Sequence, residues 1–78
     1  MKTVTLYTRA GCHLCDAARE RLERARERAV FRLEVVDIDG DASLRERYNE
    51  DVPVVAVDGR ELFRYLVDVE EFLERVRA

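Results

Sequence analysis

The hydrophobic pattern of this chain changes repeatedly between the period of a strand and the period of a helix, which restricts the folds open to it. Residues 3–7 alternate and are rich in β-branched side chains, as is typical of a strand. From Cys12 or His13 onward, apolar residues recur every three or four positions, which predicts a helix. We predict strands at 3–7, 31–38, 54–57 and 60–65, and helices beginning at residue 12 or 13, after Asp41 and after Asp68, in the order βαβαββα.

This order predicts an α/β fold. Two crossover units followed by a hairpin imply a four-stranded mixed sheet flanked by helices. The nearly all-apolar stretch 54–57 suits a buried central strand, and Asp58-Gly59 suits a tight hairpin turn. Asp41 is a candidate N-cap, and Asp68 with Glu71 forms a candidate capping box. The predicted buried faces are Leu14, Ala18, Leu22, Ala25 and Ala29 on the first helix, and Val69, Phe72, Leu73 and Val76 on the last.

Length and composition indicate one folded domain over residues 1–78. A hydrophobic content of 47% is too high for a disordered segment, even with 40% charged residues. The sequence has no apolar run of membrane-spanning length and no signal-peptide pattern. We therefore expect a cytoplasmic protein without a membrane partner. We expect a monomer, because no apolar heptad or long unpaired strand is evident.

The charge pattern argues against a nucleic-acid partner. The net charge is −3, and arginines alternate with glutamates over residues 19–28 instead of forming a patch of one sign. This alternation is typical of a solvated helix face with short-range ion pairs.

The only cysteines, Cys12 and Cys15, are two residues apart. A disulfide across so short a loop would stabilise the fold little, so we predict that the pair serves chemistry. The pair lies where the first strand gives way to the first helix, and the free N–H groups of a helix N-terminus favour a thiolate. We predict that Cys12 is the exposed nucleophile and that Cys15, one turn further in, is the resolving thiol.

His13 lies between the two cysteines and has two interpretations. A protonated His13 would stabilise the Cys12 thiolate and make the protein more oxidising. Alternatively, it is a solvent-exposed histidine without a specific role.

These features together resemble the glutaredoxin branch of the thioredoxin-like family, and in particular the small glutaredoxin-like proteins of bacteria. The matching features are the strand 3–7, the loop 8–11, Cys12-x-x-Cys15, Val52-Pro53 and the Asp58-Gly59 hairpin. The resemblance implies a thioredoxin-like (glutaredoxin) fold over nearly the whole chain. It implies that the Val52–Pro53 bond is cis, that Pro53 walls the substrate groove and that the backbone of Val52 pairs with an extended substrate. Arg9 matches a basic position that can bind a glutathione carboxylate, or it is a surface arginine.

Two departures from the family pattern concern glutathione. Glutaredoxins commonly have Pro-Tyr between the cysteines and Gly-Gly before the last helix. This chain has His13-Leu14 at the first place and Tyr65-Leu66 at the second, where the bulky side chains would crowd the groove. Asp68 matches a family aspartate that can contact the amino group of glutathione, and helix capping explains it equally well.

The predicted function is a dithiol–disulfide oxidoreductase that reduces protein or glutathione mixed disulfides through Cys12 and Cys15. It needs no bound cofactor or metal. Its electrons would come from glutathione, from another thiol or from a thioredoxin-type reductase. The alternatives are Cu(I) or zinc carriage by the thiolates, an iron–sulfur cluster bridged between two copies, and a redox-sensing interaction domain. The small copper carriers have the order βαββαβ and end in a strand, which differs from the order predicted here.

Overall fold

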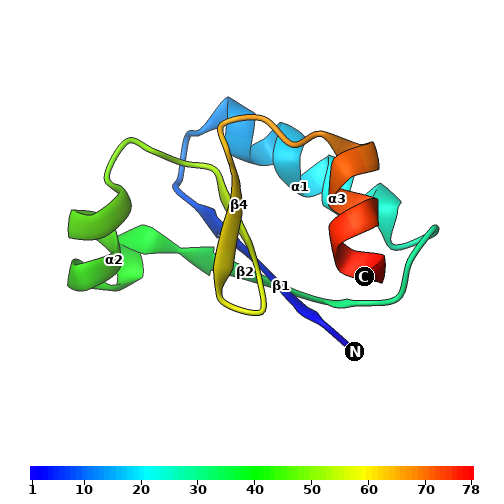
Figure 1. Cartoon of the computed structure of the whole chain (residues 1–78). Coiled ribbons are helices and arrows are strands. Elements are labelled where there is room, and N and C mark those ends of the chain that lie inside the picture. The colour runs from blue at the N-terminus through cyan, green and yellow to red at the C-terminus, as the bar shows by residue number, and fades with distance from the viewer.

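The computed structural model describes all 78 residues, and its elements follow the predicted order βαβαββα (Figure 1). The elements are β1 Thr3–Thr8, α1 His13–Ala25, β2 Arg32–Asp37, a 3-10 turn at Ile38–Gly40, α2 Ala42–Tyr48, β3 Val54–Val57, β4 Arg60–Arg64 and α3 Val69–Arg77. A helix, α2, lies between β2 and β3, so the order of elements differs from the βαββαβ order of the small copper carriers. No helix has the length and the apolar composition needed to cross a membrane.

The four strands form one mixed sheet in the order β2-β1-β3-β4, as predicted. β1 is parallel to β2 and antiparallel to β3, and β3 and β4 form an antiparallel hairpin. All four residues of β3 are buried, which suits its central position. Asp58 and Gly59 both have positive φ, +49° and +84°, as the favoured two-residue hairpin turn requires.

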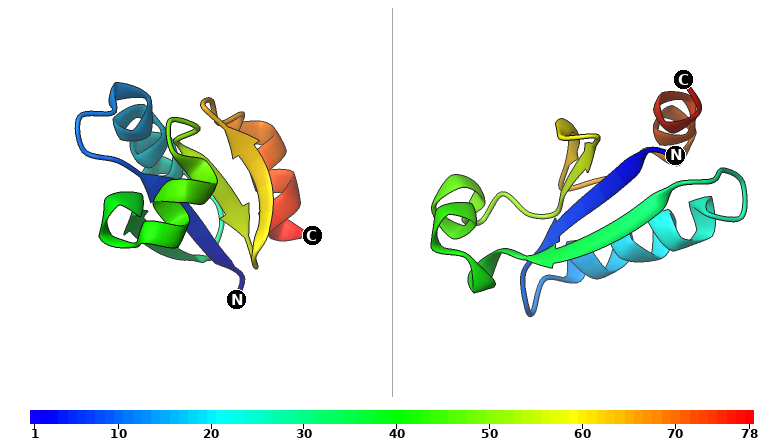
Figure 2. Two further views of the ribbon diagram at one scale, coloured as in Figure 1. Left: turned by 90° about the vertical axis from the view of Figure 1, so that its left-hand side faces the viewer. Right: turned by 90° about the horizontal axis from the view of Figure 1, so that it is seen from below.

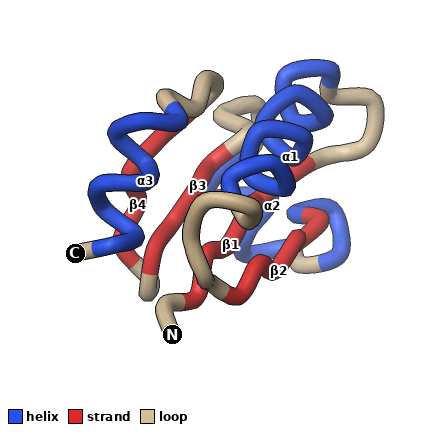
Figure 3. Tube along the Cα trace, turned by 90° about the vertical axis from the view of Figure 1, so that its right-hand side faces the viewer, coloured by secondary structure: helices blue, strands red, loops and turns tan.

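Two helices, α1 and α3, cover one face of the sheet (Figure 3), and α2 lies at one end of the sheet, away from them (Figure 1). α1 and α3 pack on the face that carries Val4 and Leu6 of β1, where Phe72 is completely buried and meets Phe31 edge-to-face at 5.3 Å between ring centroids. At the end of the sheet, Tyr48 of α2 lies 4.8 Å from the ring of Tyr7. The main core therefore lies between the sheet and the pair α1 and α3.

The predicted buried face of α1 is confirmed at Ala18, Leu22 and Ala25, and the prediction is wrong at Leu14. The buried residues of α1 are Cys15, Ala18, Leu22 and Ala25, whereas Leu14 is 46% exposed. Both Leu14 and Cys15 lie within one turn of Ala18, so periodicity alone did not distinguish them. α1 ends at Ala25, and Ala29 packs against the core from the loop that follows.

Smaller corrections concern element ends. Phe31 and Ile38 flank β2 instead of belonging to it, and Tyr65 lies just beyond β4. Val69 is only half-buried. The Asp68 carboxylate caps α3 by accepting the N–H of Glu71 at 3.1 Å, but the return bond of a full capping box is not formed.

The N-cap of α2 makes a testable contribution to stability. Asp41 Oδ1 accepts the N–H groups of Ser43 and Leu44 at 2.9 and 3.2 Å, and these bonds lower the pKa of Asp41. A carboxyl whose pKa is lower in the folded chain stabilises the fold above its unfolded-state pKa, and this contribution is lost as the pH falls through the folded value.

We therefore expect Asp41→Ala to melt at a lower temperature than the wild type near pH 7. The gap between the two melting temperatures should narrow as the pH falls toward about 3. Circular dichroism melts of both proteins across this range provide the measurement. A gap that stays constant with pH would contradict the role assigned to the carboxylate.

Candidate functional site

The sheet topology gathers four chain segments at one end of the molecule. The C-terminal ends of β1, β2 and β4 lie there together with the N-terminal end of β3, as the pairings Thr8–Asp37, Tyr7–Val54 and Val54–Arg64 show. The left view of Figure 2 shows the loops after β1, before β3 and after β4 at this end. The cysteines, the Val52–Pro53 segment and Tyr65 are therefore brought side by side although they are far apart in sequence.

The two cysteines are joined by a disulfide and differ in burial. Cys12 is the N-cap of α1 and is half-buried, whereas Cys15 is 2% exposed. The Sγ of Cys12 lies 3.1 Å from the N–H of Cys15, which donates to it. A backbone N–H aimed at the outer sulfur stabilises negative charge there, because it belongs to the positive end of the helix. The arrangement suits an attacking outer thiolate and a sheltered second sulfur.

Gly11 makes the approach to the helix possible. Its φ of +79° is unfavourable for residues with a side chain, and it turns the chain directly before Cys12. The N–H of Cys12 donates to the carbonyl of Arg9 at 3.3 Å and closes this turn.

The Val52–Pro53 peptide bond is cis, which confirms the expectation from the resemblance. The carbonyl oxygen of Val52 lies 4.0 Å from Cys12 Sγ. The N–H of Val52 makes no hydrogen bond within the protein. Because a disulfide sulfur has no hydrogen to donate, both the N–H and the carbonyl of Val52 lack a hydrogen-bond partner beside the outer sulfur.

The other predicted site residues, Arg9, His13 and Asp68, make no hydrogen bond to the cysteine side chains. Arg9 donates from Nε to Asp39 at 3.1 Å and from Nη1 to the backbone and side chain of Asn49 at 3.3 and 3.4 Å. It therefore fastens the loop after β1 to the segments after β2 and α2. His13 is exposed and makes no hydrogen bond to either sulfur, and Asp68 caps α3.

Tyr65 adds a contact that the sequence did not reveal. Its N–H donates to the carbonyl of Pro53 at 2.8 Å, and its hydroxyl donates to Asp51 Oδ1. The bond to the Asp51 carboxylate raises the pKa of Tyr65, so the phenol remains a donor. The signal was available in the hairpin register, because pairing Val54 with Arg64 places residue 65 opposite residue 53.

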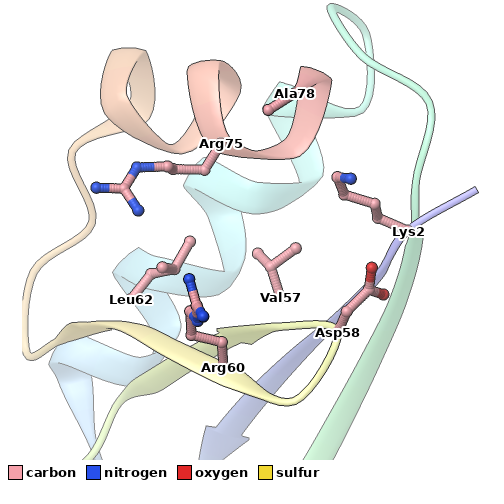
Figure 4. Close-up of a pocket in the computed structure, with 7 residues that line it drawn as sticks. All are labelled: Lys2, Val57, Asp58, Arg60, Leu62, Arg75 and Ala78. Carbon is pink, nitrogen blue, oxygen red and sulfur yellow. The ribbon is translucent and has the colours of Figure 1, made fainter.

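The largest hollow on the surface is not at the cysteines. It has a volume of about 400 Å³ and lies near Lys2, Asp58 and Arg75, at the opposite end of β1 (Figure 4). Lys2 precedes β1, whereas Cys12 follows it. No group of three or more His, Cys, Asp or Glu side chains is arranged to hold a metal ion.

Fold and site together define a glutaredoxin-like member of the thioredoxin superfamily. The model of the family "Glutaredoxin-like domain (DUF836)" matches residues 3–77, and the chain belongs to this family. It is 36% identical over 70 residues to protein Rv0508 of Mycobacterium tuberculosis, covering 83% of this chain and 72% of that protein.

Solved structures agree with this membership. Protein Ne2328 of Nitrosomonas europaea superposes with a TM-score of 0.83 at 32% identity, covering 96% of this chain and 91% of that one. Protein XcR50 of X. campestris has a TM-score of 0.74 at 40% identity and covers 95% of each chain. A thioredoxin from Halobacterium salinarum, at 16% identity with a TM-score of 0.73 and covering 97% of this chain and 72% of that one, shows the shared fold alone. The fold and the cysteine pair support a role in thiol redox chemistry.

Proposed function

We propose that this protein is a dithiol–disulfide oxidoreductase in which Cys12 attacks the substrate and Cys15 resolves the intermediate. The observation that carries the proposal is the setting of the outer sulfur. Cys12 Sγ receives the N–H of Cys15 and lies beside the unpaired backbone of Val52, while Cys15 is almost completely buried.

The reaction needs only the two thiols and a disulfide. The Cys12 thiolate attacks one substrate sulfur, forms a mixed disulfide and releases the other substrate sulfur as a thiolate that takes up a proton. Cys15, after losing its proton, attacks Cys12 Sγ, re-forms the internal disulfide and releases the second substrate thiol. Two electrons and two protons pass from the protein to the substrate. A Cα–Cα distance of 5.2 Å lets the second step occur without moving the helix.

The backbone of Val52 can orient the substrate. Its N–H and C=O lie at the end of β3, where an extended chain can add hydrogen bonds as another strand would. Such bonds would hold the substrate cysteine against Cys12 whatever the neighbouring side chains of the substrate are. The protein is reduced for the next catalytic cycle by glutathione, another thiol or a thioredoxin-type reductase. All of these occur in the cytoplasm, where we place the protein.

Replacing Cys15 with serine tests the assigned order of attack. We expect the Cys15→Ser protein to accumulate a mixed disulfide on Cys12, because the first step proceeds and the intramolecular second step is lost. Mass spectrometry after incubation with a peptide disulfide should show one peptide bound to each chain, released by a small thiol. Adduct formation on Cys15 of Cys12→Ser at the same rate would contradict the assignment.

A further inference from the structure

Tyr65 holds the substrate-facing segment from both sides of Val52. Its backbone N–H binds the carbonyl of Pro53, and its hydroxyl binds the side chain of Asp51. Its φ is +68°, a conformation that costs free energy for a residue with a side chain. The two hydrogen bonds keep the residue in this conformation, and they fix where its ring lies relative to Val52.

Large apolar side chains are exposed at this end of the sheet. Tyr65 and Leu66 are 44% and 62% exposed, and Leu14, in the first turn of α1, is 46% exposed. In strand order, Tyr65 and Leu66 follow β4 on one side of the Val52–Pro53 segment, and Leu14 follows β1 on the other. The other large apolar side chains that are exposed are Met1, Val30 and Val35.

Three arginines at this end of the sheet already have partners, whereas the exposed Arg45 of α2 forms no salt bridge. Arg9 binds Asp39, Arg64 binds Asp51 and Glu61, and Arg21 donates to the carbonyl of Val67 at 3.2 Å. The positive charges of Arg9 and Arg64 are therefore matched by carboxylates.

Three other carboxylates at the same end form no salt bridge. Asp16, Glu50 and Asp68 are exposed and take part in no salt bridge. Asp16 follows Cys15 directly, and Asp68 lies two residues after Leu66. An anionic substrate would meet uncompensated negative charge, whereas a cationic one would be attracted.

We infer that Tyr65 and Leu66 form an apolar rim that selects polypeptide disulfides with apolar and basic residues beside the cysteine over small anionic disulfides such as oxidised glutathione. This inference rests on the proposed function and names the substrate class of the same site. An extended polypeptide paired with Val52 places alternate side chains on the two sides of its backbone. Those on one side meet the ring of Tyr65 and the side chain of Leu66, while basic residues nearby lie close to the unmatched carboxylates.

The test uses two matched peptide disulfides, each a dimer of a short peptide with leucine near its single cysteine. One peptide carries lysine on either side of the cysteine and the other carries glutamate. Oxidised glutathione and the small uncharged bis(hydroxyethyl) disulfide complete the set. The pre-reduced protein is mixed with each disulfide, quenched with acid and analysed by mass for a single turnover. Each rate is divided by that of free dithiothreitol with the same disulfide, which removes the effect of neighbouring charges on the leaving thiol.

We expect the normalised rate for the lysine peptide to exceed that for the glutamate peptide and for oxidised glutathione by about tenfold at low salt, with a smaller difference at high salt. Tyr65→Ala and Leu66→Ala should each lower the ratio of the normalised rate for the lysine peptide to that for bis(hydroxyethyl) disulfide about fivefold. Tyr65→Phe keeps the ring without the bond to Asp51 and should retain the preference for the peptide. Val30→Ala, which shortens an exposed apolar side chain away from the site, is the matched control.

Two different failures are distinguishable. Equal normalised rates for the lysine peptide, the glutamate peptide and oxidised glutathione would overturn the inference while leaving the proposed function intact. The same holds if Tyr65→Ala slowed every substrate equally, because the residue would then act on the fold or the disulfide and not on substrate choice. No reaction with any disulfide, including the uncharged one, would overturn the proposed function itself.

Discussion

Cys12→Ser is expected to lower the rate of disulfide exchange by at least about a thousandfold. The thiolate is the nucleophile in such reactions, and a serine hydroxyl of nearly the same size cannot replace it. Cys15 cannot take over the first step, because its side chain is almost fully buried beneath the N-terminus of α1. Single-turnover reduction of a peptide disulfide, followed by acid quench and mass analysis, gives the rate.

The folded state provides the control for this variant. The Cys12–Cys15 disulfide closes a very short loop, so its loss should leave the thermal unfolding of Cys12→Ser close to that of the reduced wild type. The serine oxygen can still accept the N–H of residue 15 as an N-cap. A well-folded Cys12→Ser protein that retained the wild-type rate would refute the assignment of the nucleophile.

Phe72→Ala is expected to destabilise the fold by about 3–5 kcal/mol. Phe72 is completely buried between α3 and the sheet and packs edge-to-face on Phe31, so no neighbour can easily fill the space that its ring leaves. For a domain of 78 residues the whole free energy of unfolding is only about 4–12 kcal/mol. The variant should therefore be largely unfolded or melt far below the wild type, as urea titration followed by circular dichroism would reveal.

Val30→Ala is the matched control for this loss of core packing. Val30 is 79% exposed in the connection between α1 and β2, so truncating it should change the unfolding free energy by less than about 0.5 kcal/mol. If Phe72→Ala unfolded at the same urea concentration as Val30→Ala, the core assigned to α1, α3 and the sheet would be wrong.

The sequence predicted the fold well where a local pattern decided the outcome. The alternation in β1, the apolar run of β3 and the Asp58-Gly59 turn each match a single conformation, and all three are found. The buried residue in the first turn of α1 was predicted less well. Leu14 and Cys15 satisfy the helical period equally, and the choice between them depends on how the helix lies on the sheet, which is a long-range property.

For the site as well, the sequence predicted local features but not the long-range contacts. The position of the cysteines at the start of α1 followed from the sequence pattern and the cis Val52–Pro53 bond from the family resemblance, and the structure contains both features. The partners of Arg9 and Tyr65 did not follow from it. Arg9 meets Asp39 and Asn49 across 30 and 40 residues of sequence, and Tyr65 meets Asp51 across 14. Only the assembled sheet brings these side chains within reach of one another.

A thiol-trapping redox titration of the purified protein in glutathione buffers tests the central claim most directly. Mass spectrometry of the trapped species should show a reversible loss of two hydrogen atoms that links Cys12 to Cys15, with a midpoint potential between about −220 and about −320 mV. Glutathione adducts should be scarce along the titration, because the rim disfavours that anionic partner. If no disulfide formed, or if the disulfide could not be reduced again, the cysteines would not be a working dithiol couple, and thiolate metal carriage would become the leading account of the pair.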